Sequence, residues 1–116
     1  MTDLEIAKLY LFLDLTIKNL LLDLKYIYEG PFRIKDPYII FNEQLLTGAR
    51  TEMRKLKREM YKRNIQVVLL RQQGKFTTYK FITKREMKEI TYMNAVMKKH
   101  VKYVIERIAT GSAFKI

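Results

Sequence analysis

The sequence contains no cysteine, a single histidine and only four glycines among its 116 residues. Without cysteine it can form neither a disulfide nor a thiolate metal site, which suits a reducing compartment such as the cytoplasm. The lone His100 excludes a histidine-rich metal centre, and four scattered glycines cannot build a phosphate-cradling loop. We therefore expect no metal, no other cofactor and no small-molecule substrate.

Long apolar runs are also missing. The apolar run Leu9–Leu13 is interrupted by Asp14, far short of the roughly 20 residues that a membrane span needs. Asp3 and Glu5 occupy the place where a secretory signal carries positive charge. We therefore expect a cytoplasmic protein with no membrane contact.

Catalytic patterns are equally scarce. His100 lies among lysines and has no nucleophile motif near it, so we interpret it as a histidine on a helix surface. Glu86 and Glu89 lie near an expected helix start, where carboxylates favour the helix dipole. We expect a protein without catalytic residues, not an enzyme.

Acidic residues are few: 12 Asp and Glu face 23 Lys and Arg, for a net charge of +11. Residues 1–30 hold three basic and five acidic residues, a net charge of −2. Residues 31–116 hold 20 basic and seven acidic residues, a net charge of +13. A basic excess concentrated in this way is typical of nucleic-acid binding, although it also favours solubility.

The densest positive segment is Arg50–Arg63, with seven basic residues and two acidic ones. Its apolar residues Met53, Leu56 and Met60 follow the spacing of one helix face. That face can pack on a core while the opposite face stays positive. We predict that this helix contacts a polyanion.

The first helix should begin after a capping box formed by Thr2 and Glu5, and end near Tyr28 before Gly30-Pro31. It carries two apolar stripes. The main stripe comprises Ile6, Leu9, Tyr10, Leu13, Ile17, Leu20, Leu24 and Ile27. The second comprises Leu4, Leu11, Leu15 and Leu22. Either a second copy covers the second stripe, giving a homodimer, or the chain covers it itself; we favour the homodimer.

A second helix should start at Asp36-Pro37 and reach about Leu46. Gly48 then leaves two alternatives open. It is either the turn of a helix-turn-helix or a residue inside one longer helix, because the apolar spacing continues through it to Met60. Asn64 should end this helical region.

The segments Ile65–Leu70 and Phe76–Ile82 predict a β-hairpin. A three-residue loop, Gln72–Gly74, would pair Ile65 with Phe81, Val67 with Tyr79 and Leu69 with Thr77 on a buried side. The outer side would pair Gln66 with Lys80, Val68 with Thr78 and Leu70 with Phe76. The hairpin tip would then be polar and basic.

Thr83 and Glu86 suggest another capping box, followed by a helix from Lys84 to about Ala109. Its core stripe would comprise Met87, Ile90, Met97, Val101, Val104 and Ile108. Gly111 would close it, and Ser112–Ile116 would be a frayed tail. We expect one α+β domain, mostly α, with its long N-terminal helix in residues 1–30, a basic helical region and hairpin in 31–83 and a C-terminal helix in 84–110.

The candidate nucleic-acid contacts combine the basic helix, the hairpin tip and the start of the last helix. They are Arg50, Arg54, Lys55, Lys57, Arg58, Lys62, Arg71, Gln73, Lys75, Lys84 and Arg85. Arginine grips phosphate or guanine with two hydrogen bonds, and lysine acts as a point charge. Lys98, Lys99 and Lys102 form a further basic patch, and Phe76 could stack a base.

The expected order of elements, α-α-α-β-β-α with the basic helix before the hairpin, resembles a winged-helix DNA-binding domain over about Pro37–Ile82. The resemblance implies that the basic helix enters the major groove and that Arg71–Lys75 is the tip of the wing. Arg50, Arg54, Lys55, Lys57 and Arg58 would then be the recognition-helix residues. The composition, rich in Lys, Ile and Tyr, also resembles that of small phage or low-GC bacterial proteins.

Two function classes follow from the sequence. The first is a dimeric DNA-binding transcriptional regulator without enzymatic activity. The second is a protein–protein adaptor or assembly component, such as one of phage origin, that binds an acidic partner surface. The first rests on the basic helix and the charge asymmetry, and the second rests on the second leucine stripe of the first helix.

Overall fold

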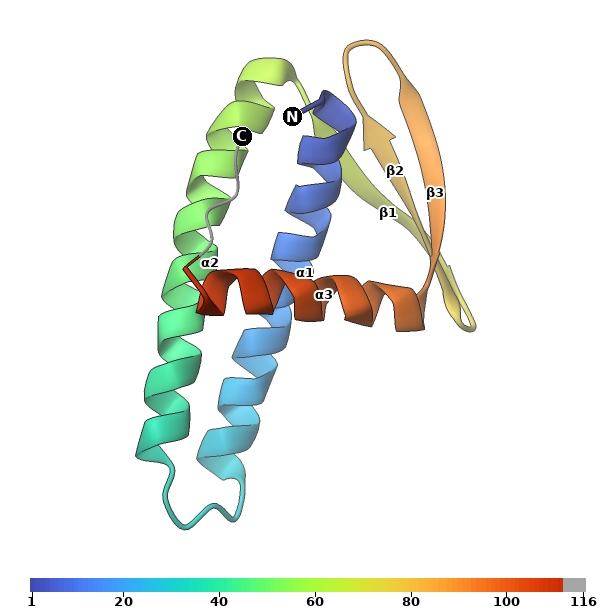
Figure 1. The fold of residues 1–116 in the computed structure, drawn as a ribbon. Helices are drawn as coiled ribbons and strands as arrows, with labels where there is room; N and C mark the ends of the chain where they lie inside the picture. Colours follow the sequence, from blue (N-terminus) through green and yellow to red (C-terminus); the bar gives the residue numbers. More distant parts are fainter. Residues whose placement is uncertain (112–116) are drawn as a thin grey trace.

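The computed structural model describes residues 1–111 as an α+β fold that is mostly helical (Figure 1). The elements in chain order are α1 (Asp3–Glu29), α2 (Asp36–Arg63), β1 (Gln66–Gln73), β2 (Phe76–Ile82), β3 (Met87–Met93) and α3 (Asn94–Ala109). The helices α1 and α2 form an antiparallel pair. The sheet, in the order β1-β2-β3, lies beside the N-terminal part of α1, and α3 crosses both long helices. The expected fold class is confirmed.

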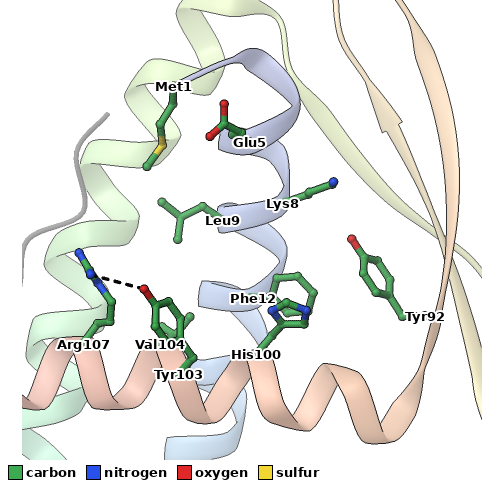
Figure 2. A pocket seen from close by; sticks show the side chains of 10 residues that line it. All are labelled: Met1, Glu5, Lys8, Leu9, Phe12, Tyr92, His100, Tyr103, Val104 and Arg107. Carbon is green, nitrogen blue, oxygen red and sulfur yellow. Dashed lines mark hydrogen bonds between the residues drawn. The ribbon is translucent and has the colours of Figure 1, made fainter.

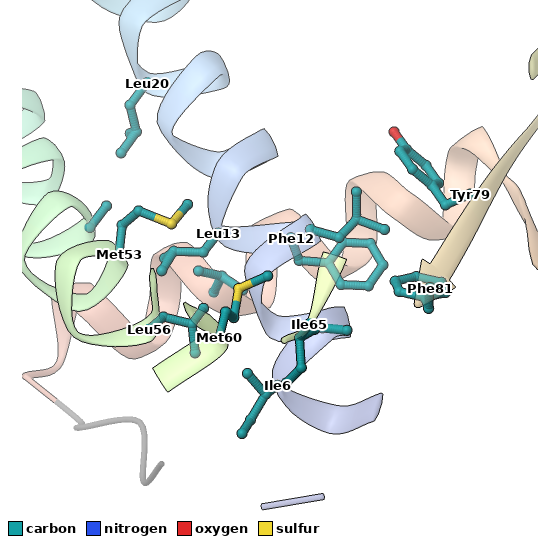
Figure 3. Packing of buried hydrophobic residues seen from close by; sticks show 14 of the residues in the cluster. Ile6, Phe12, Leu13, Leu20, Met53, Leu56, Met60, Ile65, Tyr79 and Phe81 are labelled. Atoms are coloured by element: carbon teal, nitrogen blue, oxygen red, sulfur yellow. The ribbon is translucent and has the colours of Figure 1, made fainter. Parts of the chain in front are cut away.

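The first helix begins and ends as predicted. Thr2 and Glu5 form the reciprocal capping box, and the backbone N–H of Gly30 caps the carbonyl of Tyr26. The main stripe faces α2: Ile6, Leu13 and Leu20 are at most 2% exposed. Leu13 points toward Met53 and Leu56 of α2, while its neighbour Phe12 points the other way toward Tyr79 and Phe81 of β2 (Figure 3). The core therefore lies on two sides of α1.

The second stripe is covered largely by the same chain, which corrects the expected dimer interface. Leu11 is 3% exposed, and Leu4 and Leu15 pack against the core as half-buried residues. Leu15 lies beside Tyr79 of β2 and residues of α3 in a shared cavity. Leu22 lines the same cavity but is half exposed. Leu11 is therefore closed to a second copy, and Leu4 and Leu15 are only partly accessible.

The second helix continues through Gly48 and ends at Asn64, which adopts a left-handed conformation with φ of 54°. Its buried side, which includes Leu46, Ala49 and Met53, keeps the helical spacing through the glycine. There is consequently no helix-turn-helix in Asp36–Arg63. A side chain at Gly48 would bring its Cβ to 2.8 Å from Cγ2 of Ile108, so the glycine admits α3 to the surface of α2.

The hairpin forms, but its register differs by two residues from the predicted one. Val67 pairs with Phe81 and Leu69 with Tyr79, and a bulge at Leu70 shifts the remaining pairs. The turn has two central residues, Gly74 and Lys75, and Gly74 takes φ of 58°. Tyr79 and Phe81 are buried as expected, whereas Leu69 is 52% exposed.

The segment Met87–Met93 is a strand, not the start of the last helix. It pairs with β2, with Ile90 opposite Tyr79 and Tyr92 opposite Thr77. The expected capping box is a turn in which the amide of Thr83 donates to the carbonyl of Glu86. Alternating Ile90 and Tyr92 face the core, because strand pairing to β2 outweighs the helical spacing of Met87 and Ile90.

The last helix is therefore shorter than predicted and begins at Asn94. Its stripe from Met97 onward is as expected: Val101 and Val104 are buried, and Met97 and Ile108 pack against the core. The observed order of elements is α-α-β-β-β-α, not α-α-α-β-β-α. The predicted tail, residues 112–116, lies outside the described residues.

None of the helices within residues 1–111 combines the length and the apolar character needed to cross a bilayer.

We expect the buried contact between α1 and α2 to contribute strongly to the free energy of unfolding. Leu13→Ala should lower the free energy of unfolding by about 2–5 kcal/mol, because it opens a cavity beside Met53 and Leu56. Leu69→Ala removes the same atoms from an exposed strand position and should cost about 0.5 kcal/mol or less. Urea denaturation of both variants measures the difference, and equal losses would contradict the packing described here.

Ile108 of α3 lies close to Gly48 of α2. We therefore expect substitutions at these two positions to affect stability in a coupled way. Gly48→Ala gains about 1 kcal/mol of helix propensity, but its methyl group must displace the side chain of Ile108. We expect little gain in the natural background and the full gain, about 1 kcal/mol, in an Ile108→Ala background. A double-mutant cycle by denaturation measures this coupling. Identical gains in both backgrounds would show that α3 does not press on Gly48.

Candidate nucleic-acid interface

The outer face of α2 carries most of the predicted basic contacts. Because Met53, Leu56 and Met60 are buried against α1, residues on the opposite side of the helix turn to solvent. We call this set the α2 basic face: Arg50, Arg54, Lys57, Arg58 and Lys62, all of which are exposed. Tyr61, 86% exposed, lies among them. The fold thus gathers these five cations on one helix.

Two other basic residues of the segment are engaged with carboxylates. Lys55 pairs with Glu52 at 3.6 Å, and Arg63 pairs with Glu59 at 2.8 Å and with Asp3 at 3.2 Å. The hydrogen bonds that Arg63 donates to Glu59 and, less strongly, to Asp3 raise the pKa of its guanidinium above the usual value. Arg63 therefore ties the end of α2 to the start of α1, and neither residue belongs to the α2 basic face.

The α2 basic face lacks such partners. Within residues 1–111, no carboxylate lies within 4.0 Å of the charged nitrogens of Arg50, Arg54, Lys57, Arg58 or Lys62. Arg54 donates a hydrogen bond to the hydroxyl of Thr51 at 3.3 Å, which orients the guanidinium without neutralising it. The charge of this face is therefore available to an external anion.

A groove follows one edge of the α2 basic face. It lies between the end of α2 and β1, has a volume of about 370 Å³, and is lined by Lys57 and Tyr61 from the helix and Gln66 and Val68 from the strand. Tyr10 and Met60 form part of its apolar wall. A cation and an exposed aromatic ring beside a groove suit a phosphate and its adjacent base or sugar.

The hairpin tip does not extend this surface. Arg71, Gln73 and Lys75 are exposed at the far end of β1, about 25 Å of strand from its start beside α2. Arg71 also pairs with Glu89 of β3 at 3.8 Å. The tip is fixed to the start of α3, where the amide of Asn94 donates to the carbonyl of Lys75 at 2.8 Å. The tip and the α2 basic face are separate.

Lys84 and Arg85 lie in the turn between β2 and β3, not at a helix start. This turn is at the same end of the molecule as the C-terminal end of α2 (Figure 1). Arg85 lines a cavity together with Thr2 and Asp3, the residue that pairs with Arg63. These two cations can therefore supplement the α2 basic face, whereas Lys98, Lys99 and Lys102 are exposed on α3.

A cavity of about 570 Å³ lies between α1, β3 and α3 (Figure 2). The ring of His100 stacks on Phe12 at 4.5 Å between centroids, and Tyr92 meets the edge of Phe12 at 5.4 Å. Burial raises the pKa of the Tyr92 phenol. His100 is exposed on α3, as expected, and its ring lies against Phe12 at the edge of the cavity. The sequence did not indicate this ring contact.

Residues 1–111 hold no cluster of three or more His, Asp or Glu side chains placed to bind a metal ion. In the cavity, one carboxylate, Glu5, accepts the backbone N–H of Thr2 at 3.2 Å, and this bond lowers the pKa of Glu5. Its role is therefore to cap α1. Of the surfaces described above, the α2 basic face is the one whose residues best suit a ligand.

Comparison with known proteins finds one matching family. No curated protein and no solved structure matches the chain. The family described as "YhjD protein" matches residues 1–113, which is nearly the whole chain. That description states no activity, ligand or partner. The chain belongs to the YhjD protein family.

Proposed function

We propose that this protein binds nucleic acid, preferentially duplex DNA, through the α2 basic face. The observation that carries the proposal is the set of five exposed cations on one side of α2, with no carboxylate partner within residues 1–111. Cations left unpaired by their own chain keep their full attraction for phosphates. Neutralising each phosphate releases condensed counterions, which favours binding.

The dimensions of the face suit a nucleic-acid backbone. Arg50 to Lys62 spans 12 residues of helix, or about 18 Å. Over about that length a DNA duplex presents roughly ten phosphates. Five cations along the helix can therefore each reach a phosphate without a change in the fold.

We favour a duplex over a single strand because of the way α2 packs on α1. The helix packs on α1 by one stripe, and its opposite side projects as a convex surface. A convex helix fits the major groove of B-DNA, which admits an α-helix. Arg54 and Arg58 lie one turn apart on that side and carry the planar guanidinium groups that suit guanine edges and phosphates. A regulator acting on DNA in the cytoplasm is consistent with this arrangement.

The structure changes the predicted mode of contact. Since α2 is a single helix and the hairpin tip lies at the far end of the sheet, helix and hairpin do not act together as in a winged helix. We propose instead that the α2 basic face makes the main contact. Lys84 and Arg85 in the turn between β2 and β3 would add a second one.

Salt-dependent binding tests this proposal. Affinity for a duplex should fall by about 10³ between about 50 and 200 mM salt if about six phosphates are contacted. Replacing Arg54, Lys57 and Arg58 together with Gln should weaken binding and reduce the slope of log K against log salt by about 2.7. Fluorescence anisotropy with a labelled duplex measures both quantities.

The matched control is Lys98→Gln, Lys99→Gln, Lys102→Gln on the exposed side of α3. It removes the same net charge from another surface. If both triple variants lose the same affinity, net charge and not the α2 basic face determines binding. Competition with polyglutamate distinguishes a duplex from an acidic protein surface: stronger displacement of the protein by polyglutamate than by unlabelled duplex would contradict the proposal.

The ion pairs within the basic segment give a finer prediction. Lys57 lies on the α2 basic face, whereas Lys55 pairs with Glu52 at 3.6 Å. Lys57→Gln should therefore reduce the salt slope by about 0.9, and Lys55→Gln should change it much less. The same anisotropy titration measures both single variants, and the reverse order of effects would show that another side of α2 meets the ligand.

A further inference from the structure

The distal end of the helix pair is a folded arm that projects beyond the rest of the molecule. We define the distal arm as residues 21–43: the end of α1, the connecting loop and the start of α2. At the start of the arm, Leu22 still lines a cavity with Tyr79 of β2 and Met97 of α3. Farther along, the two helices continue as a pair away from the sheet and α3 (Figure 1). The buried Leu20, Leu45 and Leu46 lie where the arm joins the body. Half-buried Leu24, Ile27 and Ile39 lie within the arm.

The outside of the arm is unusually apolar. Eight large apolar side chains of the arm are 45–69% exposed. We call six of them the distal surface: Leu22, Tyr26, Phe32, Ile34, Tyr38 and Phe41. Single exposed apolar residues are common on soluble proteins, but a concentration of this kind marks an interaction site. Leu22 and Tyr26 lie one turn apart on α1, in line with Leu11 and Leu15, which the sheet and α3 cover.

The loop at the tip holds these side chains in a defined arrangement. The ammonium of Lys35 donates to the carbonyl of Tyr28 at 2.7 Å across the loop. The rings of Phe32 and Tyr38 lie 5.8 Å apart between centroids. Gly30 is constrained as well, because a Cβ there would lie 2.7 Å from the carbonyl oxygen of Tyr26. The apolar side chains are therefore presented by an ordered scaffold, which lowers the entropic cost of binding.

We propose that the distal surface binds the distal surface of a second copy of this chain, forming a two-fold dimer. The charge distribution favours this occupant. The distal arm holds three basic and four acidic residues, a net charge of −1, whereas the remaining residues hold 20 basic and eight acidic ones, a net charge of +12. Two nearly neutral arms can meet without repulsion. An acidic protein or an anionic membrane would be drawn to the basic remainder instead.

The exposed area also fits a dimer. The distal surface carries four aromatic side chains, Tyr26, Phe32, Tyr38 and Phe41, which are each 45–61% exposed; together they offer roughly 400 Å² of surface. A specific interface of standard size uses about 800 Å² from each partner, and Leu22 and Ile34 contribute toward the difference. In a two-fold contact the same patch serves both copies, so each aromatic cluster covers the other.

The proposed contact is independent of nucleic-acid binding. The α2 basic face begins nine residues after Phe41, or about 13 Å along the helix. A dimer through the arms therefore leaves that face open. Association measured without nucleic acid tests the dimer alone, and duplex binding by a monomeric arm variant tests the basic face alone.

Sedimentation equilibrium or light scattering on the whole chain is the first experiment. Between about 1 and 100 μM, the natural protein should approach twice the 14.0 kDa mass of the chain. Tyr26→Glu, Phe41→Glu should raise the dissociation constant of the dimer by at least about tenfold. Both side chains are exposed, so circular dichroism of the variant should keep its helical signal.

The control is Phe76→Glu, Met93→Glu. These residues are neighbours on the outer face of the sheet, are 48% exposed each, and offer the other apolar surface on which copies could meet. The control should dimerise like the natural protein. A monomeric natural protein at the highest concentration, or a dimer lost in the sheet variant and kept in the arm variant, would overturn the proposal.

The cysteine-free chain permits a second, structural readout. Single cysteines at Leu22, Tyr26, Tyr38 and Phe41 should include at least one position that forms an oxidised, cross-linked dimer, since residues near a two-fold axis meet their own counterparts. Met87→Cys, on the exposed outer face of the sheet, should not. If no arm cysteine cross-links more readily than Met87→Cys, the arms are not in contact and the proposal fails.

Binding to vesicles distinguishes a membrane from a second copy. Vesicles of neutral phosphatidylcholine serve as the probe, because the nearly neutral arm has no preference for anionic lipid. The dimer should stay in solution. Cosedimentation of the natural protein with these vesicles, lost in the Tyr26→Glu, Phe41→Glu variant, would show that the arm inserts into lipid and would overturn the assignment of a second copy.

Discussion

The buried contact between α1 and α2 determines which side of the longest helix meets solvent. Leu13 and Leu20 of α1 and Met53, Leu56 and Met60 of α2 are almost fully buried along this contact. With that stripe fixed, helix geometry turns Arg54, Lys57 and Arg58 outward and turns Arg63 toward Asp3. The electrostatic character of the surface is therefore a consequence of apolar packing. The ion pairs of Lys55 and Arg63 at the edge of this contact neutralise these two cations and leave the others of the segment unpaired within residues 1–111.

The helix α1 is apolar on two sides and needs other elements to cover both. The chain covers the second side well along the first half of α1 and poorly along its distal end. Phe12 and Leu11 are covered because β2 and α3 pack against the first half of α1. The cover is incomplete at Leu22, which is half exposed although it lines a cavity with Tyr79 of β2 and Met97 of α3. The sheet and α3 do not extend along the distal end of the helix pair (Figure 1). Gly48 contributes to this arrangement by letting Ile108 approach α2 closely, which fixes where α3 crosses. The exposed apolar surface of the arm thus follows from where the covering elements end.

The sequence predicted the elements that depend on strong local signals. The capping box at Thr2, the end of α2 at Asn64 and the burial of Tyr79 and Phe81 follow from residue type and spacing alone. Gly48 could not be assigned from the sequence, because a glycine costs a helix only about 1 kcal/mol, which packing can offset. Met87–Met93 was assigned to the wrong element because Met87 and Ile90 also fit a helical stripe. Only pairing with β2, a contact between residues distant along the chain, distinguishes the two. The bulge at Leu70 is likewise a property of the paired strands and shifts the register that side-chain alternation predicts.

The difference between local signals and contacts of residues distant along the chain also applies to the candidate interface. Residues within one helix, such as Arg54 and Arg58, were grouped correctly because their relation depends on helix geometry alone. The hairpin tip was grouped with them by analogy with a fold whose turn at Gly48 this chain lacks. Because α2 is continuous, one rigid element joins the α2 basic face to the distal arm, with no hinge in between. Any partner that holds the arm consequently also sets the direction in which the cations of α2 point. The length of that helix, and not the hairpin, would fix the separation of two basic faces in an assembly.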